Sequence, residues 1–375
     1  MWDKLTHPST DTSFLGSNVS ANSWFSMATN VTTLISQVSG AIAAFWGNNT
    51  NEDNEFTASI EDDNLPDGGA ASDSKLRAFT FPQLKASTSN FRRDMVLGKG
   101  GFGSVYKGWI KENVPSLGIR KRAIAVKKLD ANSKQGFRQW RTEVGFLARL
   151  SHPNIVKLLG YCKENENFLI VYEFMQKGSL NYHLFGRSSD RLLPWEARLK
   201  IMTGMAQGLS YLHMMEKPII FRDFKSSNVL LDEILATSGD SHVTGHVVGT
   251  VGYTAPEYIA AGWLYVKSDV YSFGVVIVEM LTGRKAIDKN RPSSKRCLVE
   301  WVKPYLKQKA KLRKVIDSRL EGKFSPKEAI EIALIAIALV ADKCLNSNHK
   351  CRPSMIEVAE RLKKIEARYR TINEG

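Results

Sequence analysis

The segment from Phe221 to Asn228 (FRDFKSSN), called here the catalytic loop, holds three polar residues at a spacing suited to phosphoryl transfer. In its Asp-x-Lys-x-x-Asn pattern, the carboxylate of Asp223 can accept the proton of a substrate hydroxyl group. The ammonium group of Lys225 can neutralise charge on the transferred phosphoryl group, and the side-chain oxygen of Asn228 can bind Mg²⁺. Three separate roles within six residues predict a site that transfers phosphate.

A glycine-rich segment upstream predicts a nucleotide-binding hairpin. Residues 98–105 (GKGGFGSV) contain G-x-G-x-x-G, which dinucleotide-binding folds and ordinary hairpins also use. A strand-like stretch (VYKGW) follows in place of a helix, and no Gly-Lys-Ser/Thr phosphate loop is present. Glycines at a hairpin tip let backbone N–H groups lie close over phosphates. We therefore expect contacts with a nucleotide from Leu97, Gly98, Lys99, Gly100, Gly101, Phe102, Gly103 and Val105.

An apolar strand beneath this hairpin ends in a lysine, in the sequence Ile-Ala-Val-Lys with Ala125 and Lys127. Such a lysine can reach the α- and β-phosphates of the nucleotide when a carboxylate fixes its position, and Glu143 in the following helical stretch is the candidate. On its own, Lys127 would be read as a surface lysine. Its place between the glycine loop and the catalytic loop favours the nucleotide site.

Hydrophobic periodicity predicts a strand-rich part followed by a helical part, and hence an α+β fold. Strand patterns cover residues 94–130, 155–162 and 168–175. Helical patterns cover residues 134–150, 195–215, 270–282, 327–345 and 354–370.

The N-terminal part differs in composition from the rest of the chain. Residues 1–46, rich in Ser, Thr and Asn, predict a weakly structured segment, and residues 47–78 predict an acidic flexible linker. Residues 1–76 carry ten acidic and two basic side chains, so of the total charge of +14 a balance of +22 falls on residues 77–375. No stacking-aromatic or recognition-helix motif accompanies this charge, so we expect no nucleic-acid partner. No stretch is apolar and long enough to predict a transmembrane segment.

From Phe79 to about Leu362 the chain resembles the protein kinases, and in particular the plant receptor-like cytoplasmic Ser/Thr protein kinases of the PBL type. The residues that carry the resemblance are FTF at 79–81, NF at 90–91, SHPN at 151–154, VYEFM at 171–175, RDFKSSN at 222–228, GTVGYTAPE at 249–257 and KSDVYSFG at 267–274.

The resemblance implies a kinase domain over residues 79–370 with two lobes. A small β-rich N-lobe with one helix spans about 91–175, and a large helical C-lobe spans about 176–370. ATP and Mg²⁺ are the implied cofactors, with adenine held at the hinge by Glu173 and Met175 and with Tyr172 as gatekeeper.

Further implied features concern specificity and internal support. Lys225 supports Ser/Thr specificity. Asp269 is expected to brace the catalytic loop, and Glu257 to pair with Arg352. Phe221 stands where the family has Tyr or His, and a packing role is expected for it.

The sequence departs from the family after Asp232. The family continues through a short hairpin to Asp-Phe-Gly, whereas this chain reads EILATSGDSHV over residues 233–243, about a dozen residues shorter. The missing aspartate would bind the magnesium ion that bridges the β- and γ-phosphates, and losing such a contribution slows transfer by roughly two to four orders of magnitude. Asp240 is a candidate substitute ligand, although a solvated loop aspartate is the simpler interpretation.

Two functions therefore compete. The chain is an ATP-dependent Ser/Thr protein kinase of receptor-coupled plant immune or developmental signalling, with protein substrates and an upstream membrane receptor kinase. Alternatively, it is a catalytically impaired pseudokinase that acts as a nucleotide-binding scaffold or interaction partner. A mis-spliced or mis-predicted product of an active kinase gene would also have this sequence, since the other catalytic residues remain.

Regulation and location are predicted from short motifs. Residues 249–257 resemble the kinase loop that receives the substrate backbone and are called here the substrate loop. Arg222 beside the catalytic aspartate predicts activation-loop phosphorylation, with Thr244 the first candidate acceptor and Ser241 the next, while Thr250 is assigned to the substrate loop. Met1 is followed by Trp2 and the first cysteine is Cys162, so we expect no N-terminal acylation. The four cysteines have no metal-ligand spacing and fit reduced thiols. These features predict a cytoplasmic protein, with peripheral association at the plasma membrane through partners.

Overall fold

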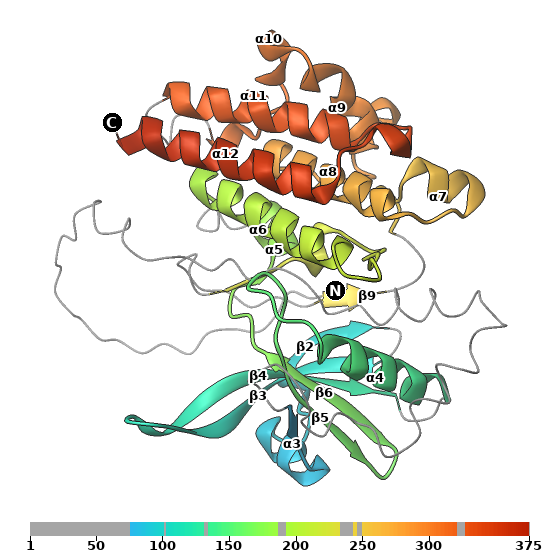
Figure 1. Cartoon of the computed structure of the whole chain (residues 1–375), viewed down its shortest axis with the longest axis vertical. Helices are drawn as coiled ribbons and strands as arrows, with labels where there is room; N and C mark the ends of the chain where they lie inside the picture. The colour runs from blue at the N-terminus through green and yellow to red at the C-terminus, as the bar shows by residue number, and fades with distance from the viewer. Residues whose placement is uncertain are drawn as a thin grey trace. The chain divides into compact units, whose positions relative to one another are not determined.

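The structure is a computed structural model that describes residues 76–100, 103–130, 134–186, 193–232, 243–245, 250–320 and 327–374. The chain divides into two units, Met1–Asn30 and Val31–Gly375, and every described residue belongs to the second unit. A sheet followed by a mostly helical part confirms the predicted α+β kinase fold (Figure 1). The predicted segment 1–46 and the linker up to residue 75 lie outside the described residues.

The N-lobe is built on a sheet whose strand order is β1-β5-β6-β4-β3-β2-β9. The strands are β1 Arg77–Ala78, β2 Val96–Gly100, β3 Gly103–Val114, β4 Gly118–Leu129, β5 Leu158–Glu164, β6 Asn167–Glu173 and β9 Val243–Gly245. Neighbours from β5 to β2 pair antiparallel, while β1 and β9 add parallel strands at the two edges. The predicted strands are confirmed, and β3 and β4 form a hairpin longer than the sequence pattern indicated.

Helix α4 (Lys134–Leu147) packs against this sheet. Its buried Trp140 donates a hydrogen bond from Nε1 to the carbonyl oxygen of Leu169 in β6, at 3.0 Å. The same ring contacts Tyr161 and Phe168 of the neighbouring strands. Aromatic packing and this hydrogen bond together set how the helix lies on the sheet, and the helix carries Glu143.

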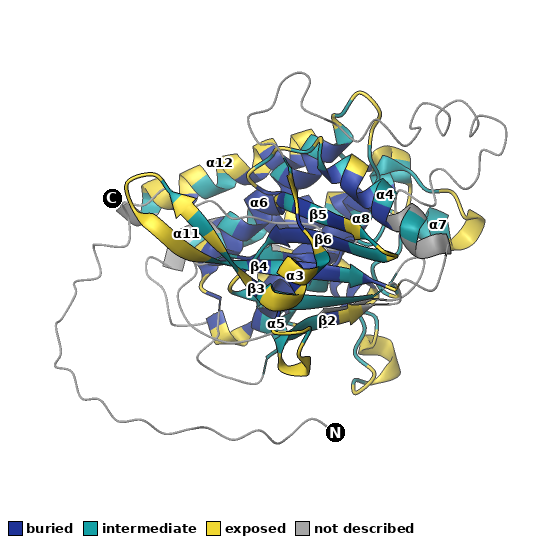
Figure 2. Cartoon of the chain, turned by 90° about the horizontal axis from the view of Figure 1, so that it is seen from below, coloured by how far each residue is buried: buried dark blue, intermediate teal, exposed yellow. Residues whose placement is uncertain are grey.

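The C-lobe is helical and is organised around α8 (Val266–Thr282), whose residues from 272 to 282 are all buried (Figure 2). The other helices of this lobe are α5 Leu180–Phe185, α6 Trp195–His213, α7 Pro256–Ala261, α9 Leu298–Leu306, α10 Lys309–Leu312, α11 Lys327–Cys344 and α12 Met355–Glu374. Helix α11 packs against α8, and α12 packs against α6. A two-stranded sheet of β7 (Gly178–Ser179) and β8 (Leu230–Leu231) lies beside the catalytic loop. None of the described helices combines the length and apolar composition needed to cross a bilayer.

The two lobes contact each other through the segment after α4. The ring of His152 stacks on that of Tyr211 in α6 with centroids 4.9 Å apart, and the Tyr211 hydroxyl accepts a hydrogen bond from the backbone N–H of Ser151 at 3.3 Å. One hydrophobic core includes Leu129 and Trp140 of the N-lobe as well as the core residues of α6 and α8. Buried side chains of the two lobes therefore belong to one hydrophobic core.

The segment before the glycine loop forms structure that the sequence patterns did not predict. Arg77–Ala78 pairs with Gly160 and Tyr161 of β5 as strand β1. Helix α3 (Phe81–Ser87) follows, with Thr80 as N-cap and Gln83 completing a capping box. At Gly160 an added Cβ would lie 2.1 Å from the carbonyl oxygen of Arg77, so the close approach of β1 requires glycine there.

We predict that Gly160→Ala displaces β1 and lowers the free energy of unfolding by about 1–3 kcal/mol, because the added methyl group overlaps backbone atoms. Gly145→Ala is the matched control: this glycine is exposed in α4, and outside the adjoining helix backbone no described atom lies within 4 Å of an added Cβ. The control should be neutral or more stable by up to about 1 kcal/mol, since alanine favours helix. Urea unfolding of both variants measures the difference, and equal stabilities would contradict the tight β1 contact.

Candidate active site

The sheet register places the predicted nucleotide contacts of the N-lobe on one face. Val105 lies opposite Lys127 in the β3–β4 ladder, and Ala125 lies opposite Tyr172 in the β4–β6 ladder. Residues directly opposite each other, and residues two apart on one strand, point to the same side of a sheet. Val105, Ala125, Lys127 and Tyr172 therefore share one face.

Lys127 and Glu143 form a buried ion pair, as the sequence predicted. Lys127 Nζ lies 2.7 Å from Glu143 Oε2, and the Glu143 side chain is 0% exposed. Glu143 Oε1 accepts a hydrogen bond from the hydroxyl of Tyr172, so the carboxylate has a partner on each oxygen. Burial raises the pKa of Tyr172 well above its ordinary value, and the neighbouring Glu143 charge adds to this. Tyr172 therefore stays neutral and donates its hydroxyl proton to Glu143. The sequence did not predict this hydrogen bond.

The described part of the glycine loop continues the strands on either side. Gly98 pairs with Val105, and Gly100 pairs with Gly103. Gly103 has φ +139°, and a Cβ there would lie 2.1 Å from the carbonyl oxygen of Lys128. Gly103 is therefore required by the hairpin itself. The backbone of Leu97 and Lys99 lies in β2, whereas Gly101 and Phe102 lie outside the described residues.

At the hinge, β6 ends at Glu173 and the chain continues through Met175, which is 7% exposed. Glu173 pairs with Ile124 across the sheet, and its carboxylate accepts a hydrogen bond from the backbone N–H of Lys157 at 2.6 Å. Burial raises the pKa of Glu173. These contacts hold the segment expected to contact adenine.

The catalytic loop brings together the three residues that its spacing singled out and adds a fourth. Asp223 Oδ2 lies 2.7 Å from Lys225 Nζ. Thr250 Oγ1 donates to Asp223 Oδ1 at 2.6 Å and accepts from Lys225 Nζ at 2.8 Å. The amide of Asn228 donates to the carbonyl oxygen of Asp223 at 2.8 Å and to its Oδ2 at 3.2 Å. Thr250 thus closes a polar cluster between the catalytic loop and the substrate loop.

The side-chain oxygen of Asn228 meets the first requirement of a metal ligand. The residue is 1% exposed, and its buried Oδ1 has no hydrogen-bond partner among the described residues, while Nδ2 donates to Asp223. A buried acceptor without a partner is costly. Mg²⁺ prefers oxygen ligands of this kind, so the residue present fits the ion.

Asp269 in the first turn of α8 anchors the start of the catalytic loop, as expected. Its Oδ2 accepts from the backbone N–H of Phe221 at 2.6 Å, and its Oδ1 accepts from that of Arg222 at 2.8 Å. His213 Nε2 lies 2.9 Å from Oδ2. Arg222 has φ +72°, a conformation that costs a non-glycine residue roughly 1–3 kcal/mol. The two backbone hydrogen bonds hold it there.

Phe221 packs under the loop, which confirms the role expected for it. It is 2% exposed and meets Phe224 edge to face with ring centroids 5.7 Å apart. Phe224 in turn lies 5.7 Å from Phe273 of α8. The loop is therefore joined to α8 by aromatic packing as well as by Asp269.

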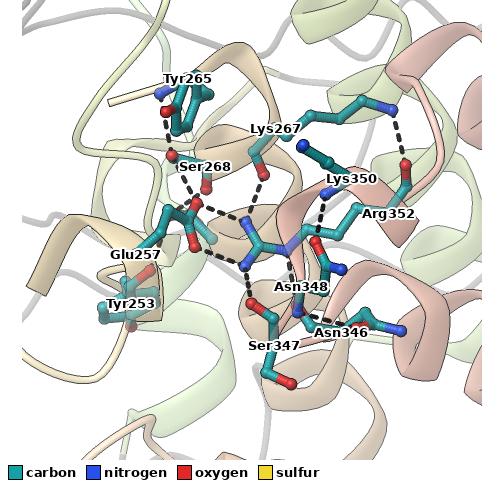
Figure 3. A network of polar contacts seen from close by, with 11 residues as sticks. Tyr253, Glu257, Tyr265, Lys267, Ser268, Asn346, Ser347, Asn348, Lys350 and Arg352 are labelled. Carbon is teal, nitrogen blue, oxygen red and sulfur yellow. Dashed lines mark hydrogen bonds and ion pairs between the residues drawn. The ribbon is translucent and has the colours of Figure 1, made fainter. Parts of the chain in front are cut away.

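The predicted pair of Glu257 and Arg352 is present and braces the end of the substrate loop (Figure 3). Nη1 and Nη2 of Arg352 donate to the two oxygens of the Glu257 carboxylate, each at 2.7 Å, and Arg352 is 2% exposed. Burial acts to raise the pKa of Glu257, but the hydrogen bonds from Arg352 and Ser268 outweigh it and the pKa is lowered. The guanidinium also donates to the carbonyl oxygen of Lys267 at 2.9 Å, which ties the pair to α8.

A second buried carboxylate, which the sequence did not single out, lies below the substrate loop. Glu279 of α8 is 0% exposed, and its Oε1 accepts from the Tyr253 hydroxyl at 2.7 Å and from the backbone N–H of Ala286 at 2.9 Å. Tyr253 Oη also lies 3.3 Å from Ser226 Oγ of the catalytic loop. Burial raises the pKa of Glu279 to about 7, although hydrogen bonds from its neighbours oppose the shift.

The remaining predicted residues are not brought into this site by described contacts. Asp240 and Ser241 lie outside the described residues, and Thr244 is described only as backbone of β9, which pairs with β2. Arg222 donates to the hydroxyl of Tyr258 in α7 at 3.1 Å.

Comparisons with known proteins agree with this geometry. The family model described as protein kinase domain matches residues 91–362. The chain belongs to the protein kinase family. It is 47% identical to probable serine/threonine-protein kinase PBL10 of Arabidopsis thaliana over 338 residues, which cover 85% of this chain and 79% of that protein. It is 44% identical to serine/threonine-protein kinase PBL36 of Arabidopsis thaliana over 370 residues, covering 93% and 76%.

A relative from rice indicates to which group of protein kinases the chain belongs. Receptor-like cytoplasmic kinase 176 of Oryza sativa subsp. japonica is 47% identical over 310 residues, which cover 78% of this chain and 76% of that protein. The kinase therefore belongs to the plant PBL-type receptor-like cytoplasmic Ser/Thr kinases, and a domain of this family uses ATP.

We predict that Glu279→Gln removes a pH dependence from the stability of this kinase. The folded state binds a proton at Glu279 up to about pH 7, whereas a glutamate in the unfolded chain loses it near pH 4.5. Between these values the folded state holds more protons, so the free energy of unfolding falls as the pH rises, by roughly 3 kcal/mol in all. Glutamine stays neutral and keeps an acceptor for Tyr253.

Urea unfolding at pH 5 and pH 8 measures this difference, with Glu360→Gln, at an exposed position on α12, as the control. The wild type and the control should lose stability at pH 8 relative to Glu279→Gln. The same pH dependence in all three proteins would show that Glu279 does not titrate in this range.

Proposed function

We propose that the kinase transfers the γ-phosphoryl group of ATP to serine and threonine hydroxyls of protein substrates in receptor-coupled plant signalling. The observation that carries the proposal is the cluster in which Lys225 and Thr250 both contact the carboxylate of Asp223. The relatives are serine/threonine-protein kinases and a receptor-like cytoplasmic kinase, which supports the proposed substrate class and signalling role.

In this proposal Asp223 is the base that receives the proton of the substrate hydroxyl. Its side chain is 21% exposed, so a substrate can reach it, whereas Lys225 is 8% exposed. Thr250 holds one carboxylate oxygen and leaves Asp223 little rotational freedom. Lys225 neutralises negative charge on the phosphoryl group during transfer.

The N-lobe residues would hold the nucleotide. Lys127, fixed by Glu143 and Tyr172, would contact the α- and β-phosphates, because an ammonium group held by a buried carboxylate is already oriented. The backbone of the glycine loop from Leu97 to Val105 would cover the phosphates. Ala125, Tyr172, Glu173 and Met175 would line the adenine end.

Asn228 would hold Mg²⁺ through Oδ1, a buried acceptor that no described residue contacts by a hydrogen bond. When bound, the ion would neutralise charge on the phosphate oxygens. The family's second ligand, the aspartate of Asp-Phe-Gly, does not occur in the sequence after Asp232. Asp240 remains a candidate Mg²⁺ ligand. For regulation, Arg222 would pair with a phosphate group on Thr244 or Ser241, so that phosphorylation of this segment would activate the kinase.

The missing Asp-Phe-Gly favours a second candidate function. A chain with Lys127, Glu143 and Asn228 in place but without that aspartate could bind ATP and act as a scaffold with little transfer. The two functions differ in turnover and agree on nucleotide binding, so they can be separated.

We predict that the purified chain transfers radiolabelled γ-phosphate from Mg-ATP to a general Ser/Thr substrate and that Asp223→Asn lowers the rate at least about 100-fold, since the base is lost. Asp94→Asn, at an exposed aspartate of the N-lobe, should keep the wild-type rate. Nucleotide binding is followed in parallel by the thermal shift that ATP produces.

Three outcomes decide the function. A rate lost in Asp223→Asn alone supports the enzyme. A thermal shift with ATP but no transfer by the wild type supports the scaffold. Equal transfer by the wild type and Asp223→Asn would show that the measured activity does not come from this site.

A further inference from the structure

The outer half of the β3–β4 hairpin extends past the rest of the sheet. The β4–β6 ladder begins at Ile124, whereas β3 and β4 continue pairing outward to Val114 and Gly118. Figures 1 and 2 show this ribbon projecting from the sheet, with its tip exposed. In this outer half Ile110 packs against the described core, whereas Trp109, Leu117 and Ile119 are exposed.

One face of the ribbon combines lysines with apolar side chains. Lys111 lies directly opposite Lys121, and the flanking pairs bring Trp109 and Ile119 to the same side, because residues two apart on a strand share a face. These four residues are called the outer hairpin face. Trp109 is 38% exposed and Ile119 74% exposed, and Leu117 in the adjoining turn is 57% exposed.

The charge of this face is not balanced within the hairpin. Like charges directly opposite each other destabilise a strand pair. The one acidic residue of segment 103–129 is Glu112, which points to the opposite side and pairs with Arg122 at 3.1 Å. Lys107 extends the row of basic side chains inward, with its ammonium group 5.4 Å from the ring centroid of Trp109. The face thus keeps a positive charge beside exposed apolar groups.

We propose that the outer hairpin face docks this kinase on the surface of an anionic lipid bilayer. Lysines attract anionic headgroups, tryptophan favours the interfacial layer, and the apolar tip at Leu117 and Ile119 can enter the acyl boundary. A narrow projecting ribbon offers no concave surface to a folded acidic protein, whereas a bilayer can take up a projecting apolar tip. The charge complementarity and the exposed apolar residues therefore favour a lipid surface.

The test is co-sedimentation of the full chain with vesicles of phosphatidylcholine alone and of phosphatidylcholine with 30% phosphatidylserine, a composition giving about the surface charge of an anionic leaflet. We expect binding to the second kind alone, weakening with salt. The variant Lys111→Gln/Lys121→Gln should lower the partition coefficient at least about tenfold, given the contribution of each lysine near such a surface. Ile119→Ser should lower it several-fold.

Lys311→Gln/Lys314→Gln is the control, since both lysines are exposed in the C-lobe and their loss removes the same total charge. It should bind like the wild type, and thermal unfolding verifies that all variants fold. Absence of binding to anionic vesicles, or equal loss in the control and the hairpin double variant, would overturn the proposal. Unchanged binding of Ile119→Ser would also overturn the proposal, because the partner would then be recognised through its negative charge alone. Phosphate transfer is not needed for this assay, so its result is independent of the proposed function.

Discussion

The carboxylate of Asp269 is the contact on which the rest of the site depends. Both of its oxygens accept backbone N–H groups at the start of the catalytic loop, and the side chain is 1% exposed. One of those groups belongs to Arg222, whose positive φ would otherwise be unfavourable. Asp223 is the next residue, so its direction is set by a buried charge that satisfies two donors. Without that anchor, the contacts of Lys225 and Thr250 would have no fixed partner.

The same principle recurs through the molecule: each buried charge near the site is held by groups from different elements. Glu143 joins α4 to β4 and β6, while Glu257 joins the substrate loop to Arg352. Removing one partner of such a pair costs about 3–5 kcal/mol, because the other charge stays buried. Because the cost of desolvating both charges offsets most of their attraction, we infer that the intact pairs align the elements more than they stabilise the fold. Glu279 differs, since a neutral carboxyl group suits its buried position beneath Tyr253.

Much of the fold was predictable because strands and helices here follow the periodicity of their apolar residues. The Lys127–Glu143 and Glu257–Arg352 pairs followed from motif resemblance. Short motifs record residue types and spacing, so they could not show that the Tyr172 hydroxyl reaches Glu143, or that Glu279 lies under the substrate loop. Both contacts arise from packing between elements distant in sequence. Strand β1 was missed for a similar reason: two residues carry no periodic signal, and their pairing depends on the absence of a side chain at Gly160.

Hydrogen exchange of the peptide that spans residues 219–229 tests the role of Asp269 most directly. In the wild type the N–H groups of Phe221 and Arg222 are bonded to a buried carboxylate, so they should exchange slowly. In Asp269→Asn one of them must face an amide N–H₂ group, and exchange in this peptide should accelerate at least about tenfold, since a hydrogen bond to a charged group contributes about 1.5–3 kcal/mol. Peptides from α4, whose residues make no described hydrogen bond or ion pair with Asp269, should be unchanged. Equal exchange of the 219–229 peptide in both proteins would contradict the claim that Asp269 holds the catalytic loop.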